Sequence, residues 1–278
     1  MLTLRTFTLA CTIAVLPITT ALAQTAAPAA PATGTYEPKV GQEGKDVIWV
    51  PTAQTLVDSM LKMGEITADD YVVDLGSGDG RTVISVAKLG ARGHGIEYNP
   101  DMVALSKRNA EAAGVADRAT FAQADIFESD FSDADVITLF LLPDLNVRLR
   151  PTLLEMEPGT RVVSNSFNMG DWTPDETVEV ADDCTNWCRA YKWVVPAKVA
   201  GEWIVGEGQL ELAQTYQMLS GSLTQDGRSH EISDAKMDGR TIAFTANGTR
   251  YTGEIAADNT MTISADGGER LSATRSAG

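Results

Sequence analysis

The chain has 278 residues, of which 44% are hydrophobic and 22% charged, and its formal net charge is −16 at pH 7. This apolar content excludes a wholly disordered chain, and the length predicts one large domain or two smaller ones. The acidic balance excludes a non-specific nucleic-acid binder, because such proteins bind phosphates through Lys and Arg. Three cysteines are too few for a disulfide scaffold, and two histidines leave little room for a multi-histidine site, so we predict no metal.

Residues 1–23 have the pattern of a secretory signal peptide, with one basic residue, a short apolar run and the sequence Ala-Leu-Ala at 21–23. The run is shorter than the roughly 20 residues that a membrane-spanning helix needs, and Pro17 interrupts it. An uncleaved membrane anchor is the alternative. We therefore expect an exported protein, periplasmic or secreted, without a membrane span after cleavage. Residues 24–43, rich in Ala, Pro and Thr over their first half, are predicted to be a flexible linker.

Apolar runs alternate with helical patterns between residues 44 and 199, which predicts a Rossmann-like, doubly wound α/β sheet covered on both faces. Asn99 and Pro100 have the features of a helix N-cap and first helical residue. Two more strand patterns around a short polar turn predict an antiparallel hairpin at one sheet edge. In chain order we expect strands 71–75, 93–98, 119–124, 134–142, 161–166, 178–182 and 190–195, and helices 81–89, 101–113 and 146–156.

Cys184 and Cys188 lie in the turn of this expected hairpin. Cysteines this close in sequence can pair once the protein has left the reducing cytosol, so we predict a structural disulfide. A metal-binding or redox-active C-x-x-x-C pair is the alternative. It is disfavoured because further ligands are not near in sequence and redox motifs use C-x-x-C.

From about residue 200 the pattern changes to short alternating runs separated by turn pairs such as Asp226-Gly227 and Asn247-Gly248. These features predict a small antiparallel all-β domain over residues 200–278, separate from the α/β domain over residues 44–199. The expected runs are 203–205, 210–212, 216–224, 241–245, 250–255, 261–264 and 270–274.

A glycine-rich loop, DLGSGDG at 74–80, joins the first expected strand to a helix, and its glycines allow the backbone to turn sharply and to approach a ligand. The dinucleotide fingerprint requires Gly or Ala at the position of Arg81, so the loop disfavours NAD. The carboxylate of Asp74 suits an ammonium group. Glu97 and Asp125 end the next two strands, where they can accept hydrogen bonds from ribose hydroxyls and from an adenine amino group.

The segments VVDLGSGDGR, GIEYNP and QADIF resemble three motifs of the class I S-adenosylmethionine-dependent methyltransferases. The resemblance covers about residues 45–198, and the expected hairpin is similar to the antiparallel last strand of that fold. More narrowly, VPTAQTLVDSML followed by VDLGSGDGRTVISVAK is similar to the ATP-synthase c-subunit lysine methyltransferases and their bacterial relatives. The resemblance implies S-adenosylmethionine as cofactor, held by Thr52, Asp74, Gly76, Gly78, Gly80, Glu97, Tyr98 and Asp125.

The same resemblance implies N-methylation of a protein lysine, with a small molecule as the other possible acceptor. Polar groups after the fourth and fifth strands could orient the amine, so Asp144, Asn146 and Asn165 are the candidate catalytic residues. Helix capping is the alternative role for Asp144. Trp49 is either an aromatic wall for a methylated cation or a packing residue.

Export is in tension with a cofactor that is made in the cytosol, so two further functions stay open. One is an exported nucleoside-binding module without turnover. The other is a scaffold whose β-rich tail binds a partner in the cell envelope. In each case we expect a monomer that binds no nucleic acid.

Overall fold

A computed structural model describes residues 36–258, 260–266, 268 and 270–276. The predicted signal peptide and the first twelve residues of the predicted linker lie outside this part of the chain. Across the described residues, every helix is too short or too polar to cross a membrane.

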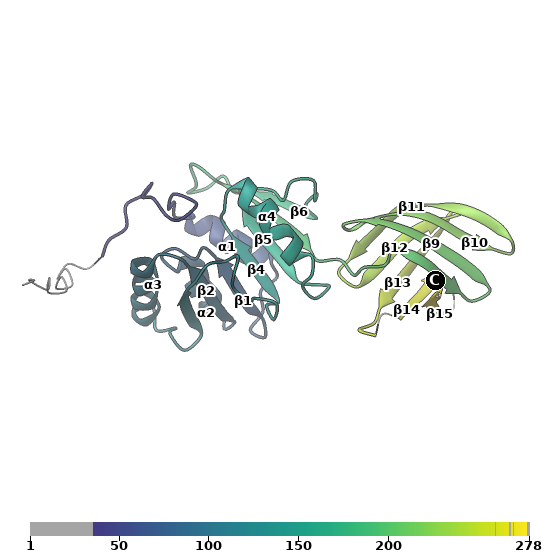
Figure 1. Ribbon diagram of the computed structural model, residues 1–278, viewed down its shortest axis with the longest axis horizontal. Coiled ribbons are helices and arrows are strands. Elements are labelled where there is room, and N and C mark those ends of the chain that lie inside the picture. Colours follow the sequence, from purple (N-terminus) through teal and green to yellow (C-terminus); the bar gives the residue numbers. More distant parts are fainter. Residues whose placement is uncertain (1–35, 259, 267, 269, 277–278) are drawn as a thin grey trace, which may run out of the picture. The chain divides into compact units, whose positions relative to one another are not determined.

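Seven strands of the described chain form one mixed sheet (Figure 1): β1 (Tyr71–Leu75), β2 (Arg92–Glu97), β3 (Ala119–Gln123), β4 (Val136–Leu139), β5 (Arg161–Asn165), β6 (Glu176–Glu179) and β7 (Arg189–Val194). Their order is β3-β2-β1-β4-β5-β7-β6. The first five pair in parallel, and β7 runs antiparallel to both of its neighbours. The strand order reverses between β1 and β4, which is where open α/β sheets form their ligand crevices.

The described residues form four helices around this sheet, and both faces are covered as predicted. Val72 of β1 lies in a core cluster with the first two helices, whereas its neighbour Val73 lies in the cluster with the fourth. This alternation follows from the two-residue period of a strand. The second and third helices share another cluster with β3. The helices are α1 (Gln54–Met63), α2 (Arg81–Lys88), α3 (Pro100–Ala112) and α4 (Pro143–Leu153).

Two helix starts show how local sequence sets the boundaries. The Asn99 side chain accepts hydrogen bonds from the backbone amides of Asp101 and Met102, so the predicted cap of α3 is confirmed. Helix α4 begins at Pro143, three residues earlier than predicted, and Leu142 is its N-cap. Proline is well suited to a first helical position because its fixed φ is already helical.

The expected hairpin is confirmed, since β6 and β7 pair antiparallel with Val178 opposite Ala190. A disulfide joins Cys184 to Cys188 in the connecting loop. Strand β7 also pairs with β5, so this hairpin completes one edge of the sheet.

The C-terminal strands form a closed antiparallel barrel in which β15 pairs with β8 and β9 pairs with β10 (Figure 1). Its first strand begins at Gly201, after the last sheet strand ends at Val194. The barrel strands are β8 (Gly201–Val205), β9 (Gly208–Thr215), β10 (Met218–Gln225), β11 (Arg228–Asp238), β12 (Thr241–Ala246), β13 (Thr249–Ile255), β14 (Met261–Ala265) and β15 (Arg270–Arg275).

Strand β11 is absent from the seven runs expected from the sequence, although it is 11 residues long. Only Ala235 and Met237 of this strand are buried, so it lacks the apolar alternation that identifies a strand. Its pairing with β12 also shifts register between Ser233 and Lys236, and Asp234 has a φ of 49° there. Such a bulge interrupts the two-residue period. The C-terminal region is therefore a closed eight-stranded barrel rather than a looser set of hairpins.

We predict that Gly221→Ala destabilises the barrel by about 2–4 kcal/mol. Gly221 has a φ of 143°, and a Cβ atom there would lie 1.9 Å from the carbonyl oxygen of Glu211 on the neighbouring strand. Gly248→Ala is the matched control, because it has a φ of 76° but open space around its Cβ position. It should lose only about 1–2 kcal/mol. Urea denaturation of both variants measures the difference, and equal losses would contradict the clash.

Candidate functional site

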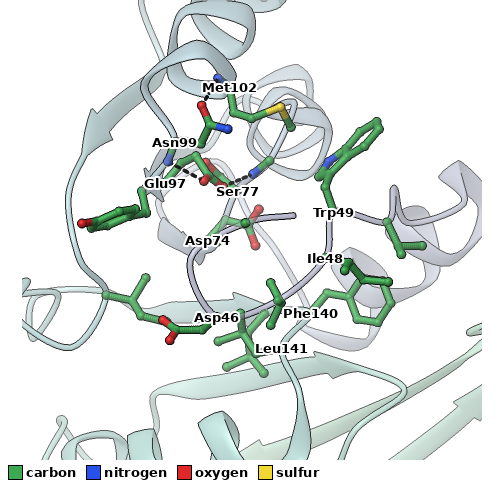
Figure 2. Close-up of a pocket in the computed structure, with 18 of the residues that line it drawn as sticks. Asp46, Ile48, Trp49, Asp74, Ser77, Glu97, Asn99, Met102, Phe140 and Leu141 are labelled. Atoms are coloured by element: carbon green, nitrogen blue, oxygen red, sulfur yellow. Dashed lines mark hydrogen bonds between the residues drawn. The ribbon is translucent and has the colours of Figure 1, made fainter. Parts of the chain in front are cut away.

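A cavity of about 750 Å³ lies at the carboxyl ends of the parallel strands, beside the point where the strand order reverses. This volume is in the range of small-molecule binding sites. Figure 2 shows Asp74, Ser77 and Glu97 gathered in one half of this pocket and Phe140 and Leu141 in the other. The pocket therefore has a polar half and an apolar half, and the polar half contains Asp74 and Glu97, two of the residues predicted to bind the cofactor.

Asp74, at the end of β1, has a side chain that is almost fully buried, with 7% of the residue exposed. Burial raises the pKa of Asp74 to about 7; the hydrogen bond from the Thr138 hydroxyl, 2.7 Å long, opposes this rise, and the negative charges of Glu97 and Asp79 add to it. A nearby cation would stabilise the charged form of such a carboxylate. The site thus fits the ammonium group of an amino-acid ligand.

Glu97 ends β2 and connects the glycine loop to the start of α3. One of its carboxylate oxygens accepts a hydrogen bond from the amide of Gly78 at 3.0 Å, and the other accepts from the amide of Asn99 at 2.9 Å. Each oxygen keeps a further lone pair, so the carboxylate can also accept from two hydroxyl groups. Gly78 is needed here because a Cβ atom would lie 2.8 Å from the Trp49 indole nitrogen.

Residues 42–52, which we call the strap, precede α1 in the chain and line the pocket. The strap turns back on itself, with Glu43 bridged to Ile48. Two residues of the predicted linker, Gln42 and Glu43, therefore belong to the pocket wall. Trp49 lies beside the glycine loop, at the polar half of the pocket.

Asp125, the residue expected at the adenine, and Tyr98 both line the pocket, and the strap contacts both. The Lys45 ammonium pairs with Asp125 and lies 4.7 Å from the centre of the Tyr98 ring. The hydrogen bond from Lys45 lowers the pKa of Asp125, and the amide of Phe127 donates to its other carboxylate oxygen at 3.0 Å. Asp125 is therefore ionised and already bonded on both oxygens, so it would use a remaining lone pair for an adenine amino group.

Thr52 is fixed on two sides within the pocket. Its hydroxyl accepts from the Asn165 amide at 3.1 Å, and its carbonyl accepts from the Arg81 guanidinium at 2.7 Å. Arg81 also pairs with Asp79 at 2.6 Å. The end of the strap is thereby held against the end of β5 and the start of α2.

Gly80 is placed differently from the prediction, since the pocket lining includes Gly76 and Gly78 but not Gly80. It has a φ of 82°, and a Cβ atom there would lie 2.7 Å from the Phe121 ring and 2.9 Å from Ser106. Gly80 therefore permits close packing of the start of α2 against β3 and α3.

The three candidate catalytic residues also lie outside the pocket lining. Asn146 is fully buried, and its amide donates to the carbonyls of Phe167 and Asn168, both at 3.2 Å, so it braces the loop after β5. Asn165 is fully buried and holds Thr52. Asp144 is exposed in the first turn of α4, where it does not occupy the cap position proposed for it. The two asparagines are thus positioning residues.

Sequence reasoning missed several residues that line the pocket. Ser77 is buried in the glycine loop and its hydroxyl has no hydrogen-bond partner among the described residues. Three aromatic residues, Phe140, Phe167 and Trp187, line the apolar half. An aromatic residue near a strand end has the same sequence pattern as a core residue, so only the fold reveals it. Within the described ranges, His, Cys, Asp and Glu form no group of three that could hold a metal ion.

We predict that the raised pKa of Asp74 makes the ligand-free protein less stable as the pH rises. The folded chain keeps a proton that the unfolded chain releases, so the free energy of unfolding falls between about pH 4 and pH 7. Asp74→Asn should remove this fall and exceed the parent by up to about 4 kcal/mol at pH 8, with little difference at pH 4. Urea denaturation across this range measures the difference.

Asp130→Asn is the control for this titration, because hydrogen bonds from Ser132 lower the pKa of Asp130. Its effect at pH 8 should have the opposite sign. The raised pKa of Asp74 would be refuted if the stabilities of the parent and of Asp74→Asn changed in parallel from pH 4 to pH 8.

Comparisons with known proteins agree with this geometry. The ANTKMT methyltransferase domain family matches residues 74–176. A protein-lysine N-methyltransferase of Saccharolobus islandicus is 41% identical over 143 residues, which cover 50% of this chain and 89% of that protein. The ATP-synthase c-subunit lysine N-methyltransferase of Mus musculus is 34% identical over 172 residues, covering 60% of this chain and 67% of that protein.

A solved structure, an RNA methyltransferase of Salinibacter ruber in complex with S-adenosyl-L-homocysteine, is 48% identical. It has a TM-score of 0.51, and the match covers 54% of this chain and 96% of that one. The bound product of that protein fits the cofactor predicted from Asp74, Glu97 and Asp125. The chain accordingly belongs to the family of S-adenosylmethionine-dependent methyltransferases that includes the protein-lysine N-methyltransferases.

Proposed function

We propose that this enzyme N-methylates a lysine side chain of a protein. Two relatives of the chain that are named as protein-lysine N-methyltransferases support the proposal. The main structural support is the charge of the pocket. Six acidic residues line the pocket against two basic ones. Both basic residues are paired, Lys45 with Asp125 and Arg81 with Asp79. This lining favours a cationic acceptor and disfavours the phosphates of an RNA, which proteins bind through free Lys and Arg.

The polar half of the pocket supplies the cofactor contacts in this proposal. Asp74 holds the ammonium group, Glu97 accepts from the ribose hydroxyls, and Asp125 lies at the adenine with Tyr98 beside it. When bound, S-adenosylmethionine supplies a methyl group to the amine nitrogen, its sulfur keeps the bonding electron pair, and the amine releases one proton. The chain's own task is to orient the amine toward that methyl group.

The transfer assay follows labelled methyl groups from S-adenosylmethionine into a cell-envelope extract, with separate protein and RNA fractions. We expect label in protein, released as methyl-lysine after acid hydrolysis.

Asp74→Ala should weaken S-adenosylmethionine binding by about tenfold to hundredfold, because a charge-assisted hydrogen bond is lost. Calorimetry measures that loss.

Asp130→Ala is the matched control, because Asp130 is an exposed carboxylate outside the pocket lining. Its affinity and transfer rate should equal those of the parent. Label in the RNA fraction would overturn the lysine assignment, and a parent protein that binds S-adenosylmethionine without transferring label would favour a binding module.

We also propose that the protein acts after export, in the periplasm or outside the cell. The signal-peptide pattern of residues 1–23 supports this compartment, and so does the Cys184–Cys188 disulfide, since disulfides persist in oxidising compartments. We predict that the protein recovered from the cell envelope begins at Gln24. N-terminal sequencing checks the cleavage site, and an intact Met1 in that fraction would support an uncleaved anchor instead.

A further inference from the structure

The apolar half of the pocket is built from aromatic side chains that three separate segments contribute. Phe140 directly follows β4, Phe167 follows β5, and Trp187 lies in the loop between β6 and β7. The ring centres of Phe167 and Trp187 are 5.2 Å apart, those of Phe140 and Phe167 are 6.0 Å apart, and those of Phe140 and Trp187 are 6.1 Å apart. These distances are typical of contacting aromatic rings. We call these three residues the aromatic wall.

The aromatic wall is only partly covered. Trp187 is 47% exposed, and both phenylalanines are half-buried. A large exposed indole beside a pocket is a feature of binding surfaces, because the aromatic face can receive a ligand. The carboxylates predicted to bind the cofactor lie at the carboxyl ends of β1, β2 and β3, so the wall at the ends of β4 and β5 remains for the second substrate.

The loop that carries Trp187 is closed covalently. The disulfide joins residues 184 and 188, so Trp187 sits in a ring of five residues. Trp187 has a φ of 60°, and Asp183, next to the ring, has a φ of 52°. Bulky side chains rarely adopt this left-handed conformation, and it persists where surrounding structure enforces it. Opening the disulfide removes the covalent constraint that favours this conformation.

We propose that the aromatic wall binds the alkylammonium end of the methyl acceptor, and that the Cys184–Cys188 disulfide holds Trp187 in the wall. The inference rests on the proposed lysine specificity, since a cation over an aromatic face is attracted by the ring quadrupole. Acceptor binding then depends on the oxidised loop. Cofactor binding does not, because Asp74, Glu97 and Asp125 lie on other segments.

The test uses choline as a cationic probe and 3,3-dimethylbutan-1-ol as its neutral isostere. Both are titrated by NMR into the full protein saturated with S-adenosyl-L-homocysteine. We expect choline to shift the Trp187 indole signal and to bind more tightly than the alcohol. Trp187→Ala should weaken choline binding about threefold to thirtyfold, and Trp187→Phe should retain most of it. Met218→Ala, at an exposed barrel residue outside the pocket lining, should change nothing.

The disulfide is tested in the same titration. Reduction of the parent protein, or the double substitution Cys184→Ala and Cys188→Ala, should weaken choline binding as Trp187→Ala does. The double variant should not respond to the reductant. Calorimetry with S-adenosyl-L-homocysteine should give unchanged affinity in every variant, which shows that each one is folded.

Three results would overturn the proposal: no choline shift in the oxidised parent, equal binding of the alcohol, or choline binding that survives Trp187→Ala. Choline binding that is unchanged by reduction would overturn the role of the disulfide. A parent protein that does not bind S-adenosyl-L-homocysteine would instead contradict the proposed function. Failure of the aromatic-wall proposal and failure of the proposed function are therefore distinguishable.

Discussion

The burial of one carboxylate, that of Asp74, is the constraint on which the rest of the site depends. A buried charge is unfavourable unless a partner compensates for it, and the Thr138 hydroxyl compensates only in part. The folded chain therefore holds a group that titrates near neutral pH in the middle of its binding pocket. An ammonium group of a ligand would stabilise the ionised carboxylate, and this stabilisation would contribute to the affinity for the ligand. The folded chain tolerates the buried carboxylate because packed cores on both faces of the sheet stabilise the strands on which Asp74 and Thr138 lie.

Most of the remaining contacts of the polar half join segments that are far apart in sequence. Glu97 accepts hydrogen bonds from the glycine loop and from the start of α3, and Thr52 is held by the end of β5 and by Arg81. Lys45 fastens the strap to Asp125. The Asn99–Glu97 bond is local, but each of the other pairs joins residues on different elements and therefore needs the assembled sheet. The polar half of the pocket therefore depends on the assembled domain.

The sheet, and the meeting of three carboxylates in one pocket at its edge, could be predicted from the sequence for the same reason. In a parallel sheet the carboxyl ends of the strands meet at one edge, so chain order alone brings Asp74, Glu97 and Asp125 together. The same reasoning put the candidate catalytic residues in the pocket as well, but the pocket lining includes none of the three. Asn146 lies in the first turn of α4, after β4, yet its amide donates to the backbone of the loop after β5. A sequence pattern gives the position of a side chain along an element but not the direction in which it makes its hydrogen bonds. Strand β11 was missed because its outward residues are polar and its bulge breaks the alternation.

The two halves of the pocket depend on different conditions. The polar half is held by hydrogen bonds and ion pairs, which form in any compartment. The apolar half includes Trp187, whose loop is closed by a bond that persists only outside a reducing environment. If the aromatic wall binds the acceptor, a chain retained in the cytosol would bind its cofactor with Asp74 while its acceptor wall lacked the covalent constraint. Under the proposed export, oxidation of this loop would complete the acceptor site, and methyl transfer would be restricted to acceptors that the enzyme meets outside the cytosol.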